Sequence, residues 1–219
     1  MRGRQNFSFD SFDIKKIPFV TIVIILLNVI GLLYELEVGE DVAAYHYAMY
    51  EGALEDGEWG RMFMSGFLHF GFYHFASNMA CLFFFGMSFE RKIGPVRYVI
   101  IYIAALVGAG IAVNFFGGQS AIHAGASGGI WGLMGAALIL TIKNHQNPIY
   151  IGRGIILNLV YSFSAGVSWQ GHIGGGIAGF VTAAVVLVLF GRKGDGGNGF
   201  RYMGHNGGNT GNDDFRYLR

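Results

Sequence analysis

The chain has 219 residues, of which 53% are hydrophobic and only 13% are charged. Water-soluble domains carry about a quarter charged residues, so this composition predicts a membrane protein and excludes an ordinary soluble domain. The formal net charge of +1 offers no basic surface that could hold a phosphate backbone, so we expect no nucleic-acid partner. The single cysteine, Cys81, cannot form an internal disulfide, and we expect it to be a small buried hydrophobe.

A helix needs roughly 20 apolar residues to cross a bilayer, and several apolar runs along the chain reach about that length. The first follows a basic segment, residues 1–16, but no small-residue cleavage site comes promptly after it, so we expect a retained span. The expected spans are residues 17–36, 69–88, 96–116, 127–142, 153–167 and 169–190. The sequence therefore predicts an all-α membrane protein, a six-transmembrane-helix bundle over residues 17–190.

The distribution of basic residues orients this bundle. With six spans, Arg61 lies alone on one side, and the other 14 of the 15 Lys and Arg residues lie on the opposite side. Basic residues accumulate in the cytoplasm, so we expect both termini there. Residues 37–68 then form an outer loop whose aromatic side chains suit the membrane interface. The tail, residues 191–219, is rich in Gly and Asn and is expected to be flexible.

Four polar side chains enter the predicted spans near their outer ends: His74, Asn78, Ser127 and His172. The rise of an α-helix places all four within roughly 10 Å of those ends. Each has an ordinary reading, since a serine can bond back to its own helix, a histidine can pack, and an asparagine can join two helices. Their convergence at one depth instead indicates a site, because polar groups in a membrane are costly.

The residue types predict acyl-transfer chemistry. A serine becomes nucleophilic when a base such as imidazole takes its proton, which gives Ser127 and His172 their expected roles. At a helix N-terminus, Ser127 is surrounded by free backbone N–H groups that can stabilise an oxyanion. His74 and Asn78 are spaced i, i+4 and share a helical face, from which they can add donors.

Small residues surround these groups. Gly125 and Gly128 let the backbone and a substrate approach the hydroxyl. Gly171, Gly175 and Gly179 recur every four residues and form a stripe on which the sixth span can pack against the fourth. That packing is needed to bring His172 within about 3 Å of Ser127.

Acidic residues are absent at the depth of the histidine, so a Ser–His dyad is favoured over a triad. They lie in the tails, in residues 35–58 or at Glu90. An acid from the outer loop is the open alternative. Trp131, one turn below Ser127, either stacks on the imidazole and orients it or simply packs in the core.

At this point the sequence resembles the rhomboid family of intramembrane serine proteases over about residues 14–190. The motifs that carry the resemblance are "GASG" at 125–128, "GHIGGGIAGF" at 171–180, "HFASN" at 74–78, "GMSFERKIG" at 86–94 and "EWGRMFMSGFLH" at 58–69. The resemblance implies a nucleophile at Ser127 and a general base at His172. It also implies oxyanion donors at His74 and Asn78.

The resemblance further implies structural roles for Glu90 and for Arg61, the latter in a membrane-embedded hairpin. Three positions depart from the family pattern. Gly60 separates Trp59 from Arg61, Gly171 replaces the usual Ala before the histidine, and Trp131 replaces a Tyr. No departure removes a catalytic group.

We therefore expect a protease that uses no metal or cofactor and cleaves single-pass membrane proteins near the outer face. We expect it to lie in the lipid bilayer of a prokaryotic plasma membrane. A non-catalytic rhomboid relative that binds membrane clients is the alternative. A transporter would need polar residues along the inner half, where Asn158, Ser162 and Ser164 make no through-path. Oligomeric state is not indicated.

Overall fold

The computed structural model describes residues 17–118, 121–162 and 168–190. The helices are α1 (Phe19–Val38), α2 (Glu40–Tyr47), α3 (Arg61–Met64), η3 (Ser65–Phe67), α4 (Phe72–Cys81), η4 (Leu82–Gly86), α5 (Met87–Ile93), α6 (Pro95–Phe116), α7 (Ser127–Lys143), α8 (Ile149–Ser162) and α9 (Trp169–Phe190). The predicted segments 1–16 and 191–219 lie outside the described residues, as do residues 163–167 of the predicted fifth span.

A glycine stands at each end of the helical segment made of α4, η4 and α5: Gly71 precedes α4 and Gly94 follows α5. Helices α4, η4 and α5 follow one another without a break, and η4 is a π-helical stretch in the middle. This rod ends at Gly94, whose φ of 85° suits glycine, and Pro95 then opens α6 at a position where its missing N–H costs nothing. The predicted second span, residues 69–88, therefore begins and ends a few residues too early.

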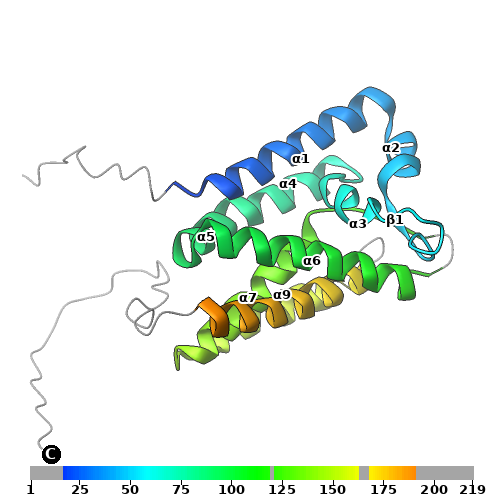
Figure 1. The fold of residues 1–219 in the computed structure, drawn as a ribbon. Coiled ribbons are helices and arrows are strands. Elements are labelled where there is room, and N and C mark those ends of the chain that lie inside the picture. Colours follow the sequence, from blue (N-terminus) through cyan, green and yellow to red (C-terminus); the bar gives the residue numbers. More distant parts are fainter. Residues whose placement is uncertain (1–16, 119–120, 163–167, 191–219) are drawn as a thin grey trace, which may run out of the picture.

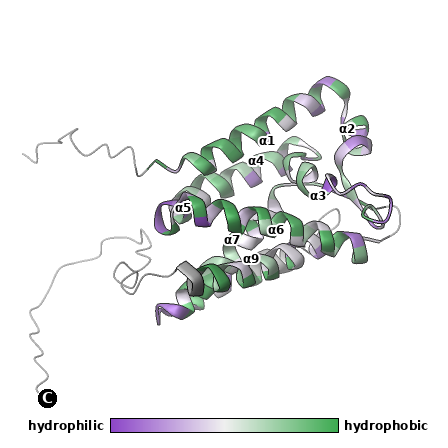
Figure 2. Ribbon diagram, in the orientation of Figure 1, coloured by the Kyte–Doolittle hydropathy of each residue, from purple (hydrophilic) through white to green (hydrophobic). Residues whose placement is uncertain are grey.

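The long helices lie side by side, with α6 between α1 and α4 on one side and α7 and α9 on the other (Figure 1). Helices α2 and α3 and strand β1 (Met49–Tyr50) gather at the end where α1 and α6 finish (Figure 1). Hydrophilic residues concentrate at this end and around α5 at the opposite end, while the helix bodies between are apolar (Figure 2). The structure therefore has an apolar belt between two polar ends.

The outer surface of the belt is itself apolar. Large hydrophobic side chains on α1 are exposed, namely Phe19, Val23, Leu26, Leu27, Ile30, Leu33 and Leu36. A patch of this extent is unfavourable in water and suits lipid. Within the described residues, α1 and α6 are long and apolar enough to cross a membrane, and α7 is a shorter apolar helix. The count of six spans stays a prediction.

Two details differ from the sequence-based expectation. A two-residue antiparallel ladder pairs Met49 with His123 and Tyr50 with Ile122, joining β1 to β2 (Ile122–His123). So short a ladder has no alternating pattern that a sequence could reveal. The burial predicted for Cys81 was wrong, because its side chain is exposed and lies in the wall of a cavity.

Glu90 fastens the start of α1 to α5. Its carboxylate accepts hydrogen bonds from the backbone N–H groups of Val20 and Thr21, at 3.0 and 2.7 Å, and from the Thr21 hydroxyl at 2.6 Å. Glu90 is only 2% exposed, so these three donors replace the water that the carboxylate loses. This is the structural role that the sequence assigned to Glu90.

Replacing Glu90 by Gln should lower the free energy of unfolding by about 2–3 kcal/mol. The charged acceptor is lost, and the NH2 group of the glutamine then faces a backbone N–H group of α1 that has no acceptor. Thermal unfolding in detergent measures this, with Glu37→Gln on the exposed face of α1 as the control. Equal unfolding midpoints for the two variants would contradict the role given to Glu90.

Candidate active site

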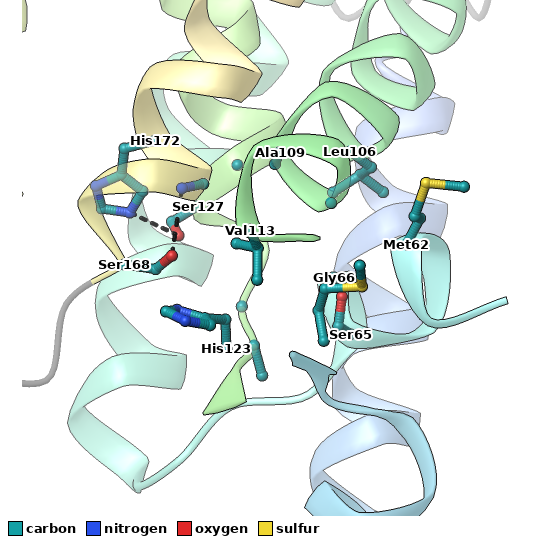
Figure 3. Close-up of a pocket in the computed structure, with 16 residues that line it drawn as sticks. Met62, Ser65, Gly66, Leu106, Ala109, Val113, His123, Ser127, Ser168 and His172 are labelled. Atoms are coloured by element: carbon teal, nitrogen blue, oxygen red, sulfur yellow. Dashed lines mark hydrogen bonds between the residues drawn. The ribbon is translucent and has the colours of Figure 1, made fainter. Parts of the chain in front are cut away.

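Ser127 and His172 come together although 45 residues separate them in the chain. Ser127 is the first residue of α7, and His172 lies in the first turn of α9. The Ser127 Oγ is 2.8 Å from the His172 Nε2 (Figure 3), and the histidine is only 6% exposed. The predicted proximity is therefore present, while the catalytic roles of the two residues stay predictions.

Backbone contact between α7 and α9 produces this short distance. A Cβ on Gly175 would overlap the carbonyl oxygen of Gly128, and one on Gly179 would overlap the backbone of Gly132. The two helices thus touch through their main chains, as the glycine stripe predicted. Any side chain at these positions would move the histidine away from the serine.

The turn before Ser127 is held from the side of η3 and α4. Gly125 has a φ of 127°, which other residues rarely adopt, and its N–H donates to the Ser65 carbonyl at 2.9 Å. The Ala126 N–H donates to the His69 Nε2 at 3.3 Å. These bonds fix the path of the chain immediately before Ser127.

The other predicted oxyanion residues lie on α4. A Cβ on Gly125 would sit 2.8 Å from the His74 Nε2 and 3.6 Å from the Ser127 Oγ, so the imidazole of His74 reaches the serine side of the turn. Asn78 is buried, and its Nδ2 donates to the His74 carbonyl at 2.9 Å within the helix. The structure thus brings His74 to the serine and leaves Asn78 one of its two amide hydrogens for another acceptor.

Trp131 stacks on His172, with ring centroids 5.4 Å apart and an angle of 21° between the ring planes. The indole covers one face of the imidazole and restricts its rotation. Trp131 is also buried among core residues, and its role in orienting the histidine stays a prediction.

Arg61 ties together the segment between α1 and α4. Its guanidinium donates to the carbonyl oxygens of Ala48 and Tyr45, at 3.0 and 2.9 Å, and pairs with Glu58 at 3.4 Å. It also lies over the Tyr50 ring. Arg61 therefore supports β1, which pairs with β2, the strand shortly before Ser127.

Sequence reasoning missed His69. Its side chain is fully buried, accepts the Ala126 N–H and meets the His74 ring edge-on at 5.0 Å. Its backbone N–H donates to the Glu35 carboxylate at 2.7 Å. His69 lies in the irregular segment between η3 and α4, so helical periodicity gave no signal that linked it to His74.

Ser168 was also missed, although it stands one helical turn before His172. Its side chain points toward Ser127 (Figure 3), and its Oγ accepts the Gly171 N–H at 3.3 Å. The i, i+4 spacing of Ser168 and His172 was the signal that could have found it.

Two cavities meet at Ser127. The larger, about 1030 Å³, lies among α4, α7, α8 and the start of α9, and the smaller, about 40 Å³, lies toward α3, η3 and α6. Burial lowers the pKa of His123 beside them, and its hydrogen bond with the Gly117 carbonyl partly offsets this. Over the described part of the chain, no group of three His, Cys, Asp or Glu side chains is placed to hold a metal.

Residues 56–189 match the family model of the Rhomboid domain. The chain is 37% identical to Rhomboid protease GluP of Bacillus subtilis (strain 168) over 139 residues, 61% of this chain and 27% of that protein. It is 32% identical to RHOMBOID-like protein 5 of Arabidopsis thaliana over 143 residues, 62% of this chain and 46% of that protein. It is 27% identical to Rhomboid protease GlpG of Klebsiella pneumoniae (strain 342) over 184 residues, 80% of this chain and 65% of that protein.

The chain thus spans about a quarter to two thirds of the length of these relatives. Two of the three carry the word protease in their names, and the third is named only by its likeness to rhomboids.

Replacing Gly175 by Ala should slow the reaction of Ser127 with a fluorophosphonate by about 100-fold. The new methyl group would press on the Gly128 carbonyl and shift His172, and a displacement of about 1 Å is enough for such a loss. The labelling rate measures it. Gly152→Ala, where a Cβ meets nothing within 4 Å, is the control. Labelling of Gly175→Ala within threefold of the control would contradict the role of the contact.

Proposed function

Because the chain belongs to the rhomboid family of integral membrane proteins, we propose that it is an intramembrane serine endopeptidase with a catalytic Ser127–His172 dyad. The observation that carries the proposal is the 2.8 Å contact between the Ser127 Oγ and the His172 Nε2, at the junction of two cavities. The protease names of two relatives support the same reaction class.

In the acylation step, the neutral imidazole of His172 accepts the Ser127 hydroxyl proton through Nε2 as Oγ attacks the scissile carbonyl. Trp131 keeps the ring in place during this transfer. The imidazolium then gives the proton to the leaving amine, which breaks the peptide bond and leaves an acyl-enzyme. A water molecule hydrolyses the acyl-enzyme and restores Ser127.

The oxyanion formed during attack needs donors that are already in place. The first N–H groups of α7 have no partner inside the helix and point back toward the serine. His74 and the second amide hydrogen of Asn78 supply further donors from α4. One such donor is worth roughly 3 kcal/mol of transition-state stabilisation.

The substrates that fit this site are single-pass membrane proteins. The larger cavity has room for an extended stretch of peptide, and its wall mixes apolar side chains with His74 and Asn78. A helix hides its carbonyls, so a substrate must unwind before attack, which favours segments with small residues. We place the cut near the outer face and both termini in the cytoplasm of a prokaryotic cell, on the basis of the charge distribution.

A client-binding protein without proteolysis is the second candidate. The hydrogen bond from the Asn78 Nδ2 to the His74 carbonyl favours it, because that amide hydrogen serves the helix and not an oxyanion. Such a protein would keep the fold and the cavity but would leave Ser127 unreactive.

A fluorophosphonate probe tests the proposal on the purified protein in detergent, with the modified residue mapped by mass spectrometry. Wild type should be labelled on Ser127, Ser127→Ala should take no label there, and His172→Ala should react at least about 100-fold more slowly because the base is gone. A known rhomboid protease labelled in parallel is the control. Folded wild type that takes no label while the control is labelled would favour the client-binding protein.

A further inference from the structure

The two cavities share a small set of lining residues, which mark the passage between them. The shared residues are His123, Ala124, Ser127, Ser168 and His172. Four of the five carry polar side chains, and two of those four, Ser127 and His172, are the proposed dyad. The chemistry of acylation leaves His123 and Ser168 without a role.

Ser168 is built into this passage by its place in the chain. It immediately precedes α9, and the His172 N–H donates to the Ser168 carbonyl at 3.1 Å, so the two residues are held one turn apart. The Ser168 Oγ accepts the Gly171 N–H. Its own hydroxyl hydrogen is not needed for that bond and is available for another partner.

Gly171 makes room for this hydroxyl. A Cβ on Gly171 would lie 3.0 Å from the Ser168 Oγ, closer than side chains normally pack. The departure at Gly171, glycine where the family pattern has alanine, is thus matched by a serine hydroxyl that occupies the neighbouring space. A glycine at position 171 therefore leaves the Ser168 hydroxyl its place beside the start of α9.

The smaller cavity behind the serine is sized for water. Its volume of about 40 Å³ exceeds the roughly 10–15 Å³ that one water molecule needs, and a retained water also needs two or more polar partners. Ser65, His123 and Ser168 line this cavity beside the dyad. Figure 3 shows the Ser168 side chain between Ser127 and His123.

We propose that Ser168 positions the water that hydrolyses the acyl-enzyme, an inference that rests on the proposed protease function. The Ser168 hydroxyl hydrogen-bonds a water drawn from the smaller cavity and holds it beside the His172 Nε2. His172 takes a proton from this water as the water oxygen attacks the acyl carbonyl. The bond between that carbonyl and the Ser127 Oγ then breaks, and His172 returns the proton to Oγ.

The two halves of the reaction can be separated with 4-nitrophenyl acetate as the probe. Acylation of Ser127 releases a burst of nitrophenolate, and deacylation sets the steady rate that follows. In Ser168→Ala the burst rate should stay within about twofold of wild type, while the steady rate should fall about tenfold, the loss expected for one hydrogen bond. Ser168→Thr keeps a hydroxyl and should recover most of the steady rate.

Two further variants distinguish this role from helix capping. Ser168→Gly keeps a residue that is tolerated at helix N-caps but removes the hydroxyl, so its steady rate should stay low. Ser88→Ala is the matched control and should behave as wild type. It removes a hydroxyl in α5 that donates a hydrogen bond to the Phe84 carbonyl.

The inference is overturned if burst and steady rates fall together in Ser168→Ala, or if Ser168→Gly restores the steady rate, because Ser168 would then act through α9. It is also overturned if Ser168→Ala deacylates as fast as wild type. Wild type that shows no burst, and no fluorophosphonate label, would instead remove the proposed function on which the inference rests.

Discussion

The main-chain contact between α7 and α9 determines the distance between Ser127 and His172. Gly128 and Gly132 on one helix meet Gly175 and Gly179 on the other with no side chain between them. In lipid, helices gain little from the hydrophobic effect on association, so close packing of small residues is a main source of their attraction. The same contact that holds the bundle together therefore places an imidazole against a hydroxyl.

Other contacts in the structure hold α4 and the turn before Ser127 in place beside this pair of helices. Glu90 ties α1 to the rod of α4, η4 and α5, and that rod carries His74. His69 and Ser65 hold the turn before Ser127 from the same side. The segment between α1 and α4, organised around Arg61, reaches that turn through the β1–β2 ladder. The contacts of Ser65, His69 and β1 therefore lie beside the turn before Ser127, whereas Glu90 holds the opposite end of the bundle (Figure 1).

Much of this arrangement could be predicted from the sequence, because lipid imposes simple rules on apolar length and small-residue spacing. Hydropathy located the helices, and the glycine stripe indicated which two would touch and why. What could not be predicted depends on contacts without periodicity. The buried His69 bonds a backbone N–H from a distant segment, the β ladder is only two residues long, and Cys81 is exposed only because a cavity opens beside α4. Ser168 had a spacing signal, but its direction toward Ser127 follows from how α9 begins.

The most direct test of the central claim is proteolysis in a bilayer. The protein and a single-pass membrane protein with small residues near the outer end of its span would be reconstituted together in liposomes. Mass spectrometry would then locate any cleavage. We predict that wild type cuts one peptide bond near the outer face and that Ser127→Ala does not cut it. An intact substrate in the presence of folded protein whose Ser127 reacts with the fluorophosphonate would contradict the account, because an activated serine would then serve a different reaction.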